Sequence, residues 1–240
     1  MSDDKQINIT PKGDILEFRT GEAKQLYQYD GYQYTAESTE SLITLVRSKG
    51  SEENTIIAYT DGGIKVILDD TVITRDQDRL KYNYKYSQQF EEFRSILEKG
   101  VVFEQKQFID FLRRREPGEI NGQDMLMAAI QSFKFSSIIS GDFTYDDQDN
   151  YICSFKIGDA EGTVKIPQLI TANIEVFNES DFVQTVELEL EIKKPRDQSE
   201  KPLIALTCPK LPRYLQKAMD HEIETVENEL EGYLIVAGVI

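Results

Sequence analysis

The sequence predicts an α+β protein in which N-terminal hairpins and a strand precede central helices and a C-terminal antiparallel sheet with a closing helix. Two segments, residues 80–86 and 183–192, alternate apolar and polar side chains as half-buried strands do. Between them, over residues 87–133, the apolar spacing becomes helical. Hydrophobic residues make up 40% of the 240 residues, which is enough for a packed core and excludes a disordered chain.

The N-terminal portion is predicted to begin with a hairpin over residues 26–35, where Asp30 and Gly31 form a two-residue turn. Four tyrosines then share one face of this hairpin, here called the tyrosine face: Tyr27, Tyr29, Tyr32 and Tyr34. Two interpretations of this face stay open. It is either an interaction surface that stacks on bases or sugars, or an apolar face that packs on a helix.

A helix, a second hairpin and a strand are expected next. Residues 38–50 are predicted to form the helix, because a serine suited to the N-cap opens the segment and a glycine closes it. Residues 55–68 are predicted to form the hairpin, since the central glycines allow the positive φ of a tight turn. Residues 80–86 are predicted to be a strand with its tyrosines on one face.

Two or three helices are predicted within residues 87–133, because their apolar residues recur at helical spacing. Pro117 and Gly118 separate the last of these helices, which begins near Asn121. Three consecutive arginines, residues 113–115, precede this break. They are interpreted as the solvated end of a helix, where cations complement the negative pole, with an anion site as the alternative.

The C-terminal portion is predicted to be an antiparallel meander. Its strands are expected at residues 138–145, 151–157, 163–166, 172–177, 183–192 and 203–207. In the longest strand three glutamates share the polar face, here called the acidic ridge: Glu187, Glu189 and Glu191. A last helix is expected over residues 212–231, and an apolar tail over residues 233–239 is expected to dock on the core or on a partner.

These elements suggest three portions that can form one continuous domain. Residues 1–86 hold the first strands and helix, residues 87–135 the central helices, and residues 136–240 the antiparallel sheet with its terminal helix. The middle helices are expected to lie between the two sheet-containing portions.

Composition excludes several classes of protein. With 27 basic and 43 acidic side chains the net charge is −16, which disfavours direct binding to nucleic acid or to an anionic membrane. The opening residues show no signal peptide, and no apolar stretch approaches the roughly 20 residues of a membrane-crossing helix. Two cysteines without a CxxC pair and a single histidine leave no disulfide framework or Cys/His zinc site, and they fit a reducing cytoplasm. Cys153 is expected in the core and His221 on a solvated helix face.

Several short segments carry a resemblance to a known family: residues 41–46 (SLITLV), 66–69 (VILD), 103–112 (FEQKQFIDFL), 133–135 (FKF) and 164–167 (VKIP). Together with the closing strands and terminal helix they resemble the YfdQ-like family of phage and prophage proteins, over residues 41–229. The chain departs from that family's pattern in residues 79–94, where tyrosine, lysine and phenylalanine replace the usual tryptophan and histidine. The resemblance implies a phage or prophage accessory protein in the cytoplasm of the infected cell, and it carries over no catalytic residue.

We therefore expect a non-enzymatic accessory protein that acts through protein–protein contacts with a partner of phage or host origin. Self-association is expected through the tyrosine face or the apolar tail. No catalytic residue, cofactor or metal ligand is assigned, and no membrane or direct nucleic-acid contact is expected.

Two alternatives stay open. One is a DNA mimic that inhibits a host nuclease or defence factor, with the acidic ridge and the terminal-helix acids in place of phosphates. Those helix acids are Glu222, Glu224, Glu227, Glu229 and Glu231. The other alternative is a magnesium-dependent nuclease, because Glu191 and Lys193 match an acid-x-Lys pair and Asp181 precedes them.

Overall fold

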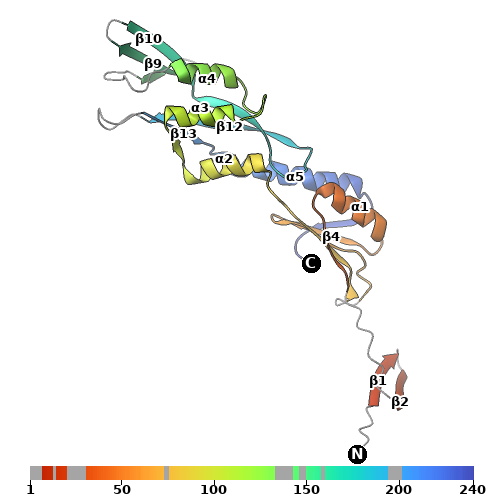
Figure 1. The fold of residues 1–240 in the computed structure, drawn as a ribbon. Coiled ribbons are helices and arrows are strands. Elements are labelled where there is room, and N and C mark those ends of the chain that lie inside the picture. The colour runs from red at the N-terminus through yellow and green to blue at the C-terminus, as the bar shows by residue number, and fades with distance from the viewer. Residues whose placement is uncertain are drawn as a thin grey trace, which may run out of the picture.

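The computed structural model describes residues 7–12, 15–20, 31–72, 76–132, 143–145, 150–157, 160–193 and 202–240. The predicted α+β class is confirmed, because helices pack on a mixed sheet in the N-terminal part and on an antiparallel sheet in the C-terminal part. Figure 1 shows these two parts with the long helix α5 (Leu211–Glu229) between them. Within the described residues, no helix is both long enough and apolar enough to cross a membrane.

The N-terminal part is built on a five-stranded sheet with the order β14-β4-β5-β6-β3. Its strands are β3 (Gln33–Thr35), β4 (Ile56–Thr60), β5 (Gly63–Ile67), β6 (Arg79–Asn83) and β14 (Leu234–Ala237). The three central strands are antiparallel, whereas each edge strand runs parallel to its neighbour. The predicted apolar tail therefore docks on the core, as the edge strand β14.

The hairpin predicted over residues 26–35 can be compared only from Gly31 onward, because residues 21–30, with Tyr27 and Tyr29, lie outside the described residues. From Gly31 the chain enters β3, which pairs in parallel with β6. That pairing joins segments more than forty residues apart, and a local turn motif carries no signal for it.

The second predicted hairpin is confirmed as β4 and β5. Gly63 begins β5 with a φ of +141°, and an added Cβ there would lie 2.0 Å from the carbonyl oxygen of Tyr82. Glycine is therefore required for two reasons, its backbone conformation and the close approach of β6.

Helix α1 (Thr39–Lys49) begins and ends as predicted. The Ser38 hydroxyl accepts a hydrogen bond from the Ser41 N–H, and the Ser41 hydroxyl accepts one from the Ser38 N–H. The helix packs with the end of α5 on one face of the N-terminal sheet. Their shared core holds Ala36, Leu42, Ile43, Val46, Ile57, Ile64, Val66, Leu68, Leu80, Tyr82, Val226 and Leu230.

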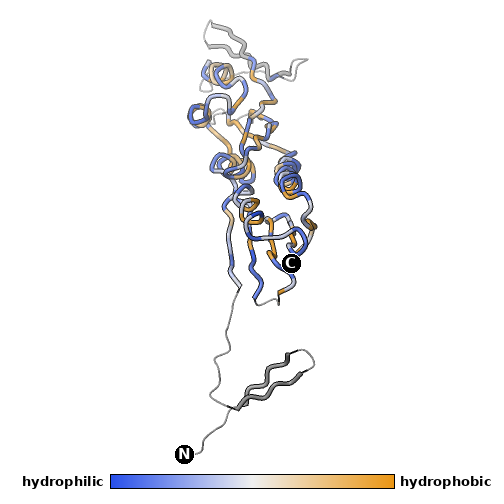
Figure 2. Tube along the Cα trace, turned by 90° about the vertical axis from the view of Figure 1, so that its right-hand side faces the viewer, coloured by the Kyte–Doolittle hydropathy of each residue, from blue (hydrophilic) through white to orange (hydrophobic). Residues whose placement is uncertain are grey.

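Of the two or three central helices that the sequence predicted, the structure has three: α2 (Gln88–Lys99), α3 (Gln105–Arg113) and α4 (Gln123–Ser132). They bury aromatic and aliphatic side chains against the antiparallel sheet of the C-terminal part. In Figure 2, hydrophobic residues line the inner sides of these helices and of the strands that they cover.

The three arginines at the end of α3 were predicted to be solvated, and the structure confirms this for only two of them. Arg113 and Arg114 are exposed, but Arg115 is buried. Its guanidinium donates to Glu119 across 3.0 Å, pairs with Glu92, and lies 4.9 Å from the ring centre of Phe111. The interpretation fails for Arg115 because the turn after α3 brings an acidic residue back onto the core.

The C-terminal part contains a four-stranded antiparallel sheet with the order β11-β12-β13-β7. Its strands are β7 (Val102–Phe103), β11 (Leu169–Glu175), β12 (Val183–Lys193) and β13 (Leu203–Thr207). A second antiparallel sheet has the order β10-β9-β8, from β8 (Phe143–Tyr145), β9 (Asn150–Ile157) and β10 (Ala160–Pro167). The predicted meander is thus divided between two sheets at Gln168. A further pair, β1 (Ile7–Lys12) and β2 (Ile15–Thr20), is antiparallel.

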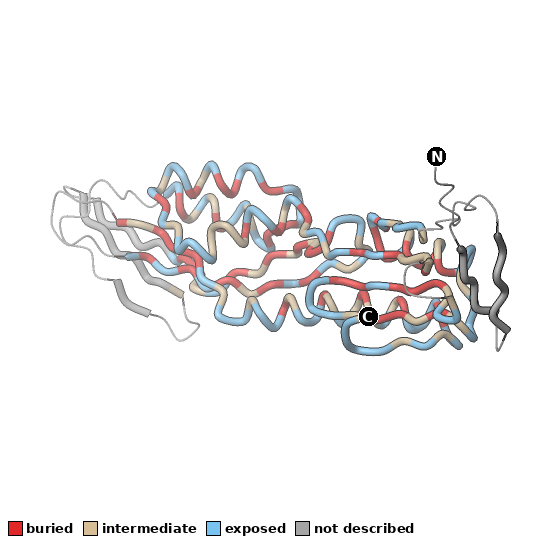
Figure 3. Tube along the Cα trace, turned by 90° about the horizontal axis from the view of Figure 1, so that it is seen from below, coloured by how far each residue is buried: buried red, intermediate tan, exposed pale blue. Residues whose placement is uncertain are grey.

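Helix α5 joins the two parts, and its predicted range of residues 212–231 is close to the observed one. Tyr214 and Ala218 belong to the core of the C-terminal part, whereas Val226 belongs to the core of the N-terminal part. Figure 3 shows buried residues along both parts of the described chain. The sheets do not follow the three predicted portions, because β14 completes the first sheet and β7 joins the C-terminal one.

Candidate functional site

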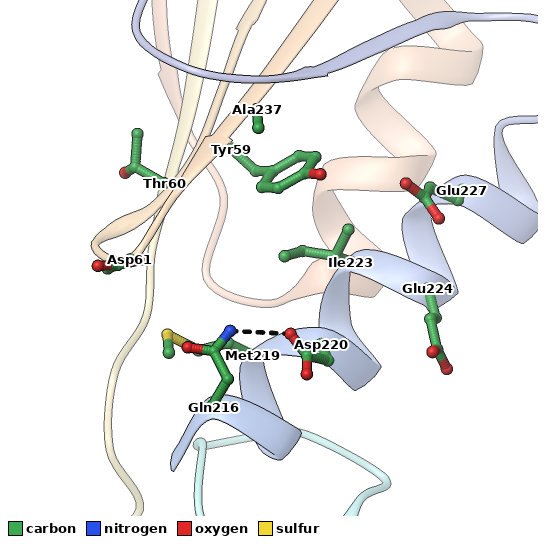
Figure 4. A pocket seen from close by; sticks show the side chains of 10 residues that line it. All are labelled: Tyr59, Thr60, Asp61, Gln216, Met219, Asp220, Ile223, Glu224, Glu227 and Ala237. Carbon is green, nitrogen blue, oxygen red and sulfur yellow. Dashed lines mark hydrogen bonds between the residues drawn. The ribbon is translucent and has the colours of Figure 1, made fainter. Parts of the chain in front are cut away.

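A pocket of about 350 Å³ lies where α5 passes the turn of the β4–β5 hairpin. Its lining comes from three elements that are far apart in sequence: the hairpin, α5 and β14. The lining residues are Tyr59, Thr60, Asp61, Gln216, Met219, Asp220, Ile223, Glu224, Glu227 and Ala237. We call this cavity the α5 pocket, and Figure 4 shows its side chains.

The helical wall of the pocket follows from the periodicity of α5. Residues spaced by three or four positions share one face of a helix, and six of them line the cavity: Gln216, Met219, Asp220, Ile223, Glu224 and Glu227. A different face of the same helix is buried and holds Tyr214, Ala218, Glu222 and Val226. The same helix therefore anchors the fold and presents a mixed acidic and apolar face to the pocket.

The sheet wall of the pocket is set by strand register. Ala237 lies beside Tyr59 in the parallel pair of β14 and β4, so both side chains are on the sheet face that α5 covers. Asp61 lies in the turn that ends β4. Figure 4 shows the Tyr59 ring and Ile223 reaching toward the middle of the pocket, with Asp61 and Glu227 on opposite sides.

Charge distinguishes the α5 pocket from an ordinary apolar groove. Four of its lining side chains carry carboxylates, and none of the described lining residues carries a cation. The Gln216 amide donates to Asp220 across 2.8 Å, which fixes the position of that carboxylate. Acidic groups around an apolar centre can hold a cation that has an apolar stem, such as a lysine or arginine side chain.

The sequence analysis placed Glu224 and Glu227 in a wider acidic surface of the terminal helix, and it missed the pocket. Met219 and Ile223, spaced by four residues among acids, were the available signal for a mixed face. The hairpin turn and β14 carry no such local signal, because only the folded chain brings them beside α5.

The burial of Glu222 contradicts the predicted acidic surface of the terminal helix. Its side chain is 4% exposed, and its carboxylate accepts hydrogen bonds from the hydroxyls of Thr39 and Ser180. Glu222 therefore connects α1, α5 and the segment before β12, and it does not face solvent. Its polar sequence neighbours, Asp220 and Glu224, gave no sign of this burial.

The other helix acids are also divided among environments. Glu224 and Glu227 line the α5 pocket. Glu229 forms an ion pair with Arg47 at 2.7 Å, and Glu231 is exposed beyond the end of the helix. These residues do not combine with Glu222 into one continuous acidic surface.

The acidic ridge is placed as the alternation predicted, on the face of β12 that points away from the core. Its members are not equivalent, however. Lys210 pairs with Glu187, and this hydrogen bond together with the lysine charge lowers the pKa of the Glu187 carboxyl below its ordinary value. Glu189 and Glu191 are exposed, so the ridge is partly neutralised at one end.

The residues of the nuclease alternative are not brought together. Asp181 precedes β12 and Glu191 lies near its other end, so they are separated by roughly 30 Å of extended chain at about 3.3 Å per residue. Asp181 instead lies 3.0 Å from His221. In the part of the chain that the structure describes, no three histidine, cysteine or acidic side chains form a group that could hold a metal ion.

The single histidine and the two cysteines are the remaining candidate residues. His221, expected on a solvated face, is partly covered, and its ring stacks on Phe182 with centroids 4.6 Å apart. Burial raises the pKa of the Cys208 thiol, which disfavours a reactive thiolate. The side chain of Cys153, in β9, lies outside the described residues.

Only half of the tyrosine face can be located, because Tyr27 and Tyr29 lie outside the described residues. The rings of Tyr32 and Tyr34 are neighbours, with centroids 6.1 Å apart. Tyr34 packs against the N-terminal core and lies under the Lys49 ammonium, whereas Tyr32 remains 60% exposed. Packing on the core therefore describes Tyr34, whereas an interaction role for the exposed Tyr32 stays a prediction.

No family model, curated protein or solved structure matches this chain. The resemblance to YfdQ-like phage proteins stays a prediction from the sequence.

Proposed function

We propose that this chain is a non-enzymatic binding protein that holds a basic segment of a partner protein in the α5 pocket. The supporting observation is the pocket's composition. Asp61, Asp220, Glu224 and Glu227 supply carboxylates, and no lysine, arginine or histidine is among the described lining residues. With a net charge of −16, the whole chain also attracts a cationic partner at long range.

The apolar centre of the pocket indicates which kind of cation it binds. Lysine and arginine combine an aliphatic stem with a charged head. Tyr59, Met219 and Ile223 offer apolar surface for such a stem, and the carboxylates offer acceptors for its head. A small inorganic cation would use only the carboxylates and not the apolar surface, so a basic side chain fits the pocket better.

The resemblance to phage and prophage proteins extends this proposal to the setting in which the chain works. The partner is then a protein of phage or host origin in the cytoplasm of an infected cell. The DNA-mimic alternative receives less support, because its helix acids are divided among a buried site, an ion pair and the α5 pocket.

The proposal is tested with a short synthetic peptide of alternating arginine and valine, called the basic probe, and with a counterpart that has glutamate in place of arginine. Calorimetric titration should detect binding of the basic probe only, with an affinity that falls as salt rises. The triple variant Asp220→Asn, Glu224→Gln, Glu227→Gln should bind the basic probe about three- to a hundred-fold more weakly, as expected for three partly exposed ion pairs.

A matched control removes the same number of charges elsewhere. The variant Glu53→Gln, Asp124→Asn, Glu189→Gln changes exposed acids outside the pocket, and it should bind as the original chain does. Equal losses in the two triple variants, or no binding of the basic probe at low salt, contradict the proposal. Loss of binding in the control variant alone also contradicts the proposal.

A further inference from the structure

β14 ends the N-terminal sheet with one side unpaired among the described strands. It pairs in parallel with β4, and no described strand pairs with its other side. Its sequence is Leu-Ile-Val-Ala, with Leu234 54% exposed and Val236 37% exposed. An apolar edge strand therefore lies at the surface of the described part of the molecule.

Natural sheets protect such edges, because the free backbone groups are a template for pairing with another chain. Lysine, proline, a β-bulge and a covering segment are among the usual protections. β14 has no charged residue and no proline, its register with β4 is regular, and no described strand covers it. This edge is therefore suited to receive an additional strand.

Alternate residues of β14 serve two different surfaces. Ile235 packs on the core and Ala237 lines the α5 pocket, so these side chains face α5. Leu234 and Val236 point to the opposite face of the sheet, where Ala58 lies beside Val236. A strand added along β14 alternates in the same way. Every second side chain then lies on the pocket side, and the others lie beside Leu234 and Val236.

We propose that the basic partner segment binds as an added β-strand along β14, with basic side chains on the pocket side and apolar side chains on the Leu234 side. This inference rests on the proposed function, because the α5 pocket selects the charge of the partner. Backbone hydrogen bonds to the edge supply affinity, and the alternating side chains supply specificity. β14 is roughly 13 Å long at about 3.3 Å per residue, so the recognised segment is short.

Charge favours a basic partner over a second copy of this chain at the same edge. Symmetric pairing of two β14 strands brings two α5 pockets toward one interface, and each pocket is lined by the carboxylates of Asp61, Asp220, Glu224 and Glu227. Like charges across an interface oppose association. The self-association expected from the apolar tail would therefore overturn the proposal if it gave a dimer that the basic probe does not dissociate.

The experiment uses backbone methylation of the basic probe, because an added strand donates to β14 through the N–H of every second residue only. Two peptides are made, one with N-methyl groups on the odd residues and one with them on the even residues. Only one of the two should lose binding to the full chain, by about tenfold or more. Equal effects of the two methylation patterns overturn strand addition.

Side-chain variants test the opposite face of the edge. Leu234→Ser with Val236→Ser should weaken binding of the basic probe by roughly tenfold. The matched variant Met125→Ser with Leu169→Ser changes exposed apolar residues elsewhere and should leave binding unchanged. If the pocket triple variant loses binding while the methylation patterns do not differ, the proposed function stands and strand addition fails. If neither change matters, both fail.

Discussion

The Arg115 guanidinium and the Glu119 carboxylate form an ion pair at 3.0 Å in which each side chain is only 4% exposed. Arg115 also lies against the rings of Phe93 and Phe111, and Glu119 accepts a second hydrogen bond, from the Glu116 N–H. Two charges are thus held out of water by each other and by the aromatic core of α2 and α3. Such a pair is costly to break because one charge then remains buried alone.

Removing the arginine alone should therefore destabilise the fold strongly. Arg115→Met keeps the apolar stem but leaves Glu119 without its cation, and we expect a loss of about 3–5 kcal/mol in the free energy of unfolding. Urea denaturation followed by circular dichroism measures this loss. The double variant Arg115→Met, Glu119→Met should lose less than the sum of the two single variants. Additive losses would contradict the assignment of a coupled buried pair.

Ionisation of Tyr82 should lower the stability of the fold at alkaline pH. Burial, assisted by the negative charge of Glu222, raises the pKa of Tyr82 to about 12 from its ordinary value near 10. The folded chain then binds the phenol proton more tightly than the unfolded chain, so this contribution is complete below pH 10 and is lost as the pH rises toward 12. Its size is about 2–3 kcal/mol. Unfolding free energies at stepwise pH should fall less steeply in Tyr82→Phe, and identical slopes would refute the linkage.

The two neighbouring glycines of the β4–β5 hairpin should respond differently to the same substitution. Gly63→Ala places a methyl group 2.0 Å from the Tyr82 carbonyl oxygen at a φ of +141°, so we expect a loss of about 2 kcal/mol or more. Gly62→Ala meets only the Thr60 hydroxyl at 3.8 Å and should change stability by less than about 1 kcal/mol. Thermal unfolding of the two variants provides the comparison, and similar losses would refute the close approach.

Strand β12 was predictable because its signal is local. The alternation of apolar and acidic residues over residues 183–192 requires a half-buried strand, and the observed strand is Val183–Lys193. Helix α1 was predictable for the same reason, since its cap residues Ser38 and Ser41 lie within the segment that they cap. Patterns within one element predict that element well.

Contacts between elements that are far apart in the sequence were not predictable in this way. β7 has only two residues, too few for a pattern, and β3 pairs with a strand from a later segment. Arg115 and Glu119 look like helix-end and loop charges in sequence, because their burial depends on the packing of Phe93 and Phe111. Half of the α5 pocket was visible as helical spacing, but its sheet wall depends on the register of β14 with β4.

Glu222 gives the sharpest test of a site that only tertiary structure defines, since its two hydrogen-bond donors lie 183 and 42 residues away in sequence. Glu222→Leu leaves the hydroxyls of Thr39 and Ser180 without their acceptor at the junction of the two parts. We expect a loss of about 2 kcal/mol in unfolding free energy, measured by urea titration, because a buried donor such as the Thr39 hydroxyl costs about 1–3 kcal/mol without its acceptor and the half-buried Ser180 hydroxyl adds less. Glu224→Leu, an exposed acid on the same helix, should change stability by less than about 1 kcal/mol. Adding Thr39→Val to Glu222→Leu should restore part of the loss, since the orphaned hydroxyl is then removed. If Glu222→Leu costs no more than Glu224→Leu, then Glu222 does not hold α1 and α5 together.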